Sequence, residues 1–273
     1  MWALARLTFR EALAKKTFIA FFICSTVFLL LLIFAFQIDV VKGQEAMLQG
    51  FGEQINRTDT VDLEQLIRGF VGVTGSAFLL GGIFLSIFAT AGLVPSMLEK
   101  GSIDLLLSKP LRRIEILVGR SIGALSIVFI NIAYLILGVW FILGLKTGMW
   151  IFDILYIVPL ICLVFVIIYA WMVLWGVLLS NSALTIMLTY LMYGISAALL
   201  ARDQIYAFLS SKVWGYILDF FYYLFPRISE MMAAPITSMQ DGGSVPLEPY
   251  ITSFIVAMGI FGLAGYIFQK KEF

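Results

Sequence analysis

The chain has 273 residues, of which 62% are hydrophobic and 13% are charged, whereas an ordinary soluble domain carries roughly 25% charged residues. The net charge of +1 gives no basis for nucleic-acid binding, and the absence of histidine removes imidazole metal sites and histidine acid–base catalysis. The composition excludes a soluble domain and indicates a single transmembrane domain over residues 1–273.

The first 16 residues form a basic stretch ahead of the first apolar run. On a helical wheel Trp2, Phe9 and Leu13 share one face, and arginines lie beside that face. This pattern is typical of an amphipathic helix in the membrane interface. We therefore expect an interfacial helix over residues 1–16, with a frayed basic tail as the alternative.

Six apolar runs follow, each long enough to cross the hydrocarbon core, which takes about 20 helical residues. Backbone polar groups in lipid must be satisfied internally, so runs of this length must be helices. The sequence therefore predicts an all-α membrane protein with six transmembrane helices. The predicted spans are residues 17–36, 70–93, 121–145, 154–179, 182–200 and 250–268.

The distribution of Lys and Arg predicts the orientation of these spans. Most of the 18 basic residues fall in short segments that an internal N-terminus would place in the cytoplasm. We therefore expect a multi-pass protein of the cell membrane with both termini cytoplasmic. The loops at 37–69 and 201–249 would then lie outside. The first of these is acidic, and we expect short helices there with solvated charges.

The segment 213–225 is apolar and rich in aromatic residues, but it is too short to span the membrane and it contains Asp219. Its length suits an interfacial or re-entrant helix. We therefore expect short helices of this kind before the last span. Counting the segment as a seventh span would place Lys270 and Lys271 outside, which the charge distribution disfavours.

The sequence carries no sign of catalysis. It has no phosphate-loop motif, H-E-x-x-H or nucleophile elbow, and no Cys/His cluster that could hold a metal. The predicted spans also lack Asp, Glu, Lys and Arg away from their ends, which argues against an ion-coupled carrier. We therefore expect no enzyme activity, and any uphill transport would need energy from a partner.

Two polar residues, Asn131 and Tyr134, lie near the middle of the third predicted span. The simpler interpretation is interhelical hydrogen bonding, worth about 1 kcal/mol. The alternative is that they line a transport pathway.

Small side chains recur at four-residue spacing in the second predicted span, which predicts a face for close helix packing. The two cysteines, Cys24 and Cys162, fall inside apolar runs and are expected to be small core residues rather than a disulfide pair. The spaced small pairs are Gly72 and Ser76, Ala77 and Gly81, and Gly82 and Ser86.

The cytoplasmic connection over residues 95–120 carries the strongest local signals. Pro95 is expected to end or kink the preceding helix. Ser96 and Glu99 fit a capping box, and Pro110 suits the first turn of the next helix. The connection should therefore be a short, well-delimited helical segment.

Within this connection Gly101 permits a break, and Leu105, Leu106 and Leu107 form an apolar triplet. A helix on the membrane surface would explain the leucines alone. A docking element for a cytoplasmic partner would explain the leucines together with the flanking charges.

The connection resembles the pattern E-x-G-[ST]-[IL]-[DE]-x-L-L-x-x-P-[LI]-x-R, which follows the second span in membrane subunits of ABC-2 type ATP-binding-cassette transporters. The resemblance extends over nearly the whole chain, through Gly119 at the entry to the third span and the Tyr223-Leu-Phe-Pro226 stretch before the last. The matching residues are Glu99, Gly101, Ser102, Ile103, Asp104, Leu106, Leu107, Pro110, Leu111 and Arg113.

This resemblance implies a permease, with export favoured, whose ATPase is a separate polypeptide. It implies a homodimer or a pair with a similar chain, plus two cytoplasmic ATPase subunits that bind ATP and Mg. Residues 96–113 would be the coupling helix seated in an ATPase groove. The residues implied in ATPase coupling are Glu99, Gly101, Asp104, Leu106, Leu107, Pro110 and Arg113.

Two other classes of function fit the composition: an ion-coupled secondary carrier and a membrane scaffold that regulates a partner without transport. A neighbouring reading frame with a phosphate-loop motif would distinguish the transporter subunit from both.

Overall fold

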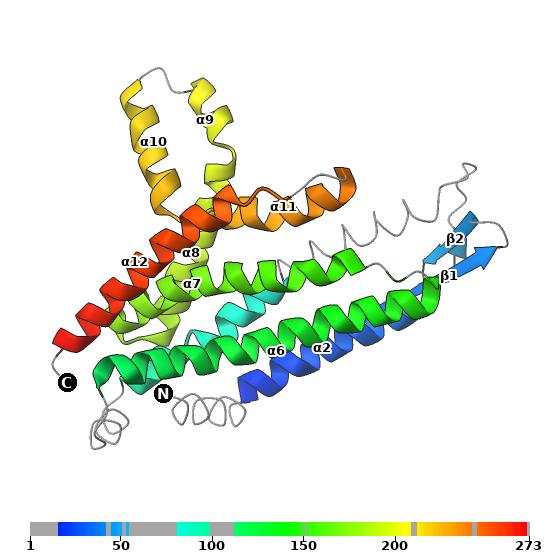
Figure 1. Cartoon of the computed structure of the whole chain (residues 1–273), viewed down its shortest axis with the longest axis horizontal. Helices are drawn as coiled ribbons and strands as arrows, with labels where there is room; N and C mark the ends of the chain where they lie inside the picture. Colours follow the sequence, from blue (N-terminus) through cyan, green and yellow to red (C-terminus); the bar gives the residue numbers. More distant parts are fainter. Residues whose placement is uncertain are drawn as a thin grey trace.

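The structure is a computed structural model of the chain, viewed in Figure 1. It describes residues 16–41, 45–50, 53–54, 81–98, 112–148, 150, 152–208, 212–241 and 245–271. The expected interfacial helix over residues 1–16 lies outside the described residues, apart from residue 16.

Helices make up most of the described chain, as the apolar runs predicted. The long helices are α2 (Lys16–Ala35), α6 (Arg113–Thr147), α7 (Ile157–Leu179), α8 (Ser182–Leu200) and α12 (Glu248–Lys270). The shorter ones are α4 (Leu93–Met97), η1 (Phe152–Tyr156), α9 (Arg202–Phe208), α10 (Lys212–Leu224) and α11 (Ile228–Asp241), together with a helical segment over residues 81–90.

Within the described residues, four helices are long and apolar enough to cross a membrane. They coincide with the third to sixth predicted spans. Two shorter apolar helices, one of which is the apolar part of α2, lie where the first two spans are predicted. The count of six spans therefore stays a prediction. The four long helices are Arg113–Lys146, Ile154–Leu179, Ser182–Leu200 and Glu248–Lys270, and the two shorter ones are Phe18–Phe34 and Gly81–Met97.

Helix α7 lies between α6 and α12 and forms the centre of the core (Figure 1). It is apolar on all sides, and such a helix is stable only where neighbours surround it. The outward faces of α2, α6 and α12 instead expose large apolar side chains such as Phe34, Phe141 and Ile255. Continuous apolar outer faces fit a protein surrounded by lipid.

A small antiparallel sheet follows α2 directly, where short helices were expected. It contains β1 (Phe36–Val41), β2 (Glu45–Gly50) and β3 (Glu53–Gln54), with Phe36 opposite Gly50. The β1 sequence is rich in β-branched residues, which favour strands. The helix expectation is therefore wrong for these strands, and the rest of the loop 37–69 lies outside the described residues.

Three short helices, α9, α10 and α11, precede α12, which confirms the expectation of short helices before the last span. Helices α9 and α10 lie side by side (Figure 1), and the Tyr206 hydroxyl donates to Oδ1 of Asp219 at 2.6 Å and lies 3.1 Å from the Gly215 carbonyl oxygen. Asp219, the one charge in this aromatic stretch, thus has a local partner.

The helix break near Pro95 is placed differently from the prediction. The segment over residues 81–90 ends at a turn formed by Ala91 and Gly92, and Pro95 lies inside the first turn of the new helix α4. A proline there sacrifices no intrahelical hydrogen bond, because the first N–H groups of a helix have no partner anyway.

Candidate functional site

The start of α6 is attached to the end of α12. The guanidinium of Arg113 donates to the main-chain carbonyls of Gln269, at 3.1 Å, and Lys271, at 2.7 Å. The last carbonyls of a helix have no intrahelical partner, and a cation there also complements the helix dipole. Arg113 therefore caps α12, and the two helix ends lie at the same end of the molecule (Figure 1).

The turn between α7 and α8 joins the same cluster. The ammonium of Lys271 donates to Oγ of Ser180 at 2.8 Å and to the carbonyl of Val177. Ser180 has a left-handed backbone with φ of 51°, and Asn181 then caps α8 by accepting from the N–H of Ala183 at 2.9 Å. Burial lowers the pKa of Lys271 below its ordinary value.

Helix α4 also packs into this end of the molecule, against α6, α7 and α8. The buried Arg120 of α6 donates to the carbonyl of Leu93 at 3.2 Å. A Cβ added at Gly176 of α7 would lie 3.1 Å from Cβ of Val94 and 3.3 Å from Cδ of Pro95, so the glycine permits this close approach. We call the start of α6, the ends of α7 and α12, the start of α8 and helix α4 the anchoring platform.

The structure describes the predicted coupling segment, residues 96–113, only at its two ends: Leu98 follows α4 and Arg112 precedes α6. Of the residues implied in coupling, Arg113 is described and caps α12. The Ser96 hydroxyl donates to the Leu93 carbonyl at 3.3 Å, while its expected capping partner lies beyond the described residues. Also outside the described residues are Glu99, Gly101, Asp104, Leu106, Leu107 and Pro110.

The two mid-span polar residues both contact α2. Asn131 is buried, and its Oδ1 accepts a hydrogen bond from Oγ of Ser25 at 3.0 Å. The hydroxyl of Tyr134 lies 3.2 Å from the hydroxyl of Thr26, at an exposed position. The interhelical hydrogen bonds of the simpler interpretation are therefore present.

Asn131 also lines a cavity between α2, α6 and the residues around Gly81, with a volume of about 170 Å³. Tyr134 does not line it. Within the described residues, a Cβ added at Gly81 or Gly82 would meet no atom within 4 Å, so the predicted close packing at these two positions stays a prediction. Cys24 is exposed and lines the same cavity, contrary to the expectation of a core residue.

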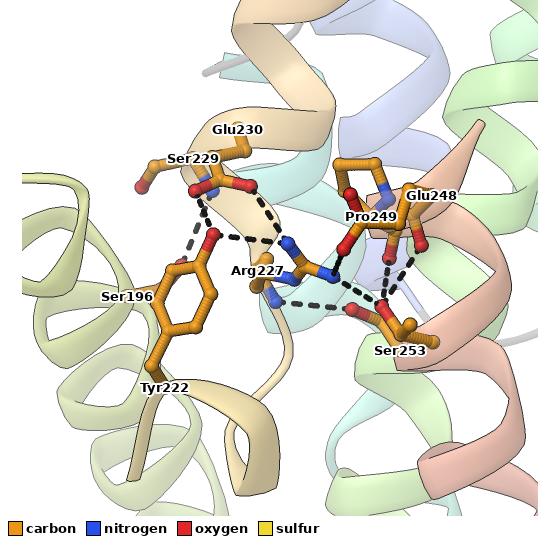
Figure 2. Close-up of polar contacts among 9 residues, drawn as sticks. Ser196, Tyr222, Arg227, Ser229, Glu230, Glu248, Pro249 and Ser253 are labelled. Carbon is orange, nitrogen blue, oxygen red and sulfur yellow. Dashed lines mark hydrogen bonds and ion pairs between the residues drawn. The ribbon is translucent and has the colours of Figure 1, made fainter. Parts of the chain in front are cut away.

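A second polar cluster centres on Arg227, between α10 and α11, and sequence reasoning did not single it out. Figure 2 shows the guanidinium between Tyr222 and Glu230 on one side and Glu248 on the other. It donates to the Tyr222 hydroxyl at 2.9 Å, to Oε1 of Glu248 at 2.9 Å and to Oγ1 of Thr252 at 2.7 Å. The cluster ties α10 and α11 to the start of α12.

The guanidinium of Arg227 stays charged in this buried place. Burial disfavours its charge, but hydrogen bonds to Glu248 and Tyr222 outweigh that effect and hold the pKa of Arg227 above its ordinary value. Burial and the hydrogen bond to Glu230 raise the pKa of Tyr222. In the sequence the cluster is an arginine after a proline with acids nearby, a pattern that is also common in solvated loops.

No protein-family model matches the chain, and a search of curated proteins finds no significant match. The resemblance to ABC-2 membrane subunits therefore depends on the motif at residues 99–113 and the arrangement of the apolar runs.

Proposed function

We propose that this chain is the membrane subunit of an ABC-2 type ATP-binding-cassette exporter, driven by separate cytoplasmic ATPase subunits that bind ATP and Mg. The observation that carries the proposal is the motif from Glu99 to Arg113, whose two flanks are held on one anchoring platform. A segment that receives force from a partner needs such firmly held ends.

The contacts of the platform suggest how force would pass from the segment to the membrane helices. Arg113 connects the start of α6 to the end of α12, and Lys271 connects that end to the α7–α8 turn. A displacement of the segment would therefore move α6 and α12 together. ATP would shift the equilibrium between inward and outward states only by its different affinity for the two.

The proposed assembly contains two membrane subunits, either two copies or a pair with a similar chain, and two ATPase subunits in the cell membrane. The platform would face the cytoplasm, because it gathers Arg112, Arg113, Arg120, Lys270 and Lys271, and basic residues concentrate on that side. The Arg227 cluster would then lie outside.

Cysteine crosslinking to an ATPase tests the proposal. The tagged chain, with Cys24 and Cys162 replaced by alanine, is purified from native membranes after single substitutions Glu99→Cys, Asp104→Cys or Leu107→Cys. We expect crosslinks to a phosphate-loop protein from these positions. The control Leu247→Cys, exposed at the start of α12, should give none.

Two results would contradict the proposal in different ways. Crosslinks confined to Ser182→Cys would move the docking site to the α7–α8 turn and reject the assigned segment. Absence of any phosphate-loop protein from the purified complex would reject the transporter assignment itself.

A further inference from the structure

A groove follows α6 along the surface of the bundle. Helix α12 packs much more closely against α7 than against α6, which leaves a hollow of about 210 Å³ between the three helices. A second hollow, of about 490 Å³ between α6 and α7, adjoins the first, because Ile122, Leu125 and Val166 line both. The structure describes the three helices here without a gap, and the groove opens outward between the exposed side chains of Phe129 and Met258.

The lining of the groove suits a hydrocarbon occupant. Most of the lining side chains are aliphatic or aromatic, and none of the described ones is charged. The hydroxyls of Ser121 and Ser126 donate to carbonyls of their own helix, at 2.9 Å to Leu117 and at 2.7 Å to Ile122. These hydroxyls therefore need no partner in the groove, and a polar occupant would lose its hydration there with little compensation.

The length and position of the groove match one leaflet of a bilayer. Its lining residues on α6 run from Val118 to Ile130, a rise of about 18 Å, while half of the hydrocarbon core is about 15 Å thick. Arg113 lies about 8 Å further along α6 from Val118, and the headgroup layer adds about 5–8 Å to each side of the core. An acyl chain in the groove would therefore place its headgroup at the level of the anchoring platform.

This end of the anchoring platform carries an excess of positive charge. The ammonium of Lys271 contacts two neutral groups, the Val177 carbonyl and the Ser180 hydroxyl, and burial lowers its pKa. Arg112 is exposed, and among the described residues at this end the acid is Glu115, which accepts from the Arg112 N–H at 3.2 Å. An anion would compensate these charges, and basic pockets between transmembrane helices are typical sites for anionic lipid headgroups.

We propose that the groove holds one acyl chain of an anionic phospholipid, whose phosphate lies near Arg112 and Lys271. The chain would contact α6 and α12, the two helices that Arg113 joins. The inference goes beyond the proposed function and does not depend on an ATPase partner. It needs only that α6, α7 and α12 cross a membrane.

The test uses two photoreactive phospholipids in nanodiscs that contain the full chain. Both carry a diazirine on one acyl chain, and they differ only in the headgroup, phosphatidylglycerol or phosphatidylcholine. Mass spectrometry measures labelling of residues 122–130 and 162–166 relative to labelling of α8, which has no charged residue and exposes Met187 and Leu191. We expect this ratio to be about two- to tenfold higher for the phosphatidylglycerol probe.

Two variants close the groove from opposite walls. Val166→Phe on α7 and Ile122→Phe on α6 each place a larger side chain where the two hollows adjoin. Each should lower labelling of the groove by both probes. The matched controls are Val27→Phe and Ile23→Phe on the exposed face of α2, which should label as the parent does.

A charge variant separates headgroup recognition from ordinary contact with bulk lipid. Arg112→Gln combined with Lys271→Gln should remove the preference for phosphatidylglycerol while the phosphatidylcholine probe still labels the groove. Lys146→Gln, at the other end of α6, is the control and should keep the preference. Equal ratios for the two probes in the parent, an unlabelled groove, a preference that survives the charge variant, or parental labelling in both filling variants would each overturn the inference.

Discussion

The guanidinium of Arg113 donates to the main-chain carbonyl of Lys271 over 2.7 Å, which joins the last residue of the motif at residues 99–113 to the end of α12. The two residues are distant in sequence, and their contact closes one end of the helix bundle. An arginine that the motif alone would assign to a partner subunit therefore has a role within its own chain.

Arg113→Ala should lower the stability of the isolated chain by about 1 kcal/mol, because two helix-end carbonyls lose a charged donor. The measurement is the thermal unfolding midpoint in detergent without any ATPase. Lys270→Ala is the control, since Lys270 is exposed and its ammonium only lies over the ring of Tyr266, 4.6 Å from its centre. An unchanged midpoint in Arg113→Ala would show that the two hydrogen bonds to the end of α12 do not stabilise the isolated chain.

Arg227→Met should destabilise the chain by about 1–3 kcal/mol, because it removes a buried donor from the buried Tyr222 hydroxyl and from the exposed carboxylate of Glu248. Arg202→Met is the matched control: Arg202 stacks on the same Tyr222 ring at 3.8 Å, and such contacts contribute about 0.5–1 kcal/mol. In chemical or thermal unfolding, Arg227→Met should be clearly less stable than Arg202→Met. Equal losses would contradict a larger contribution from the buried guanidinium of Arg227.

Gly176→Leu should push α4 away from α7 and cost about 1–3 kcal/mol, as overpacking of a close helix contact does. Val94 and Pro95 leave little room, because the contacting atoms are a Cβ and a rigid ring. Gly194→Leu, at an exposed position of α8 with open space around it, should leave the unfolding midpoint nearly unchanged. The prediction fails if the two leucine variants are equally stable.

Stability should fall at alkaline pH partly through Tyr222. Burial and the hydrogen bond to Glu230 raise its pKa in the folded chain above the unfolded value of about 10. The folded state therefore keeps the Tyr222 proton up to a higher pH than the unfolded state does. The contribution of Tyr222 to the free energy of unfolding is complete below about pH 10 and is lost as the pH rises through the folded pKa. Unfolding midpoints between pH 8 and 11 should decline less steeply in Tyr222→Phe than in the parent.

Tyr216→Phe is the control for this titration, because Tyr216 belongs to the same helix but is 75% exposed. Its midpoints should follow the parent slope across the whole pH range. A Tyr222→Phe chain that declines as steeply as the parent would exclude Tyr222 as a source of the pH dependence.

The sequence alone determined the four long apolar helices of the described chain. Long apolar runs in lipid have to satisfy their backbone polar groups internally, so α6, α7, α8 and α12 could be predicted as helices. Nearly all of their ends lie within a few residues of the predicted ones. The start of α6 was the exception, because the run of apolar residues begins at Ser121 but the helix already begins at Arg113. The short aromatic helix α10 was predicted by the same reasoning about length.

The tertiary structure decided which polar groups meet. Ser25 and Asn131, or Arg227 and Glu248, are ordinary polar residues in the sequence, and nothing in their spacing identifies their partners. The same holds for Gly81 and Gly82, whose small size is compatible with close packing as well as with a cavity wall. Hydrophobicity and backbone hydrogen bonding are local or averaged properties, whereas a hydrogen-bond partner far along the chain depends on how whole helices pack.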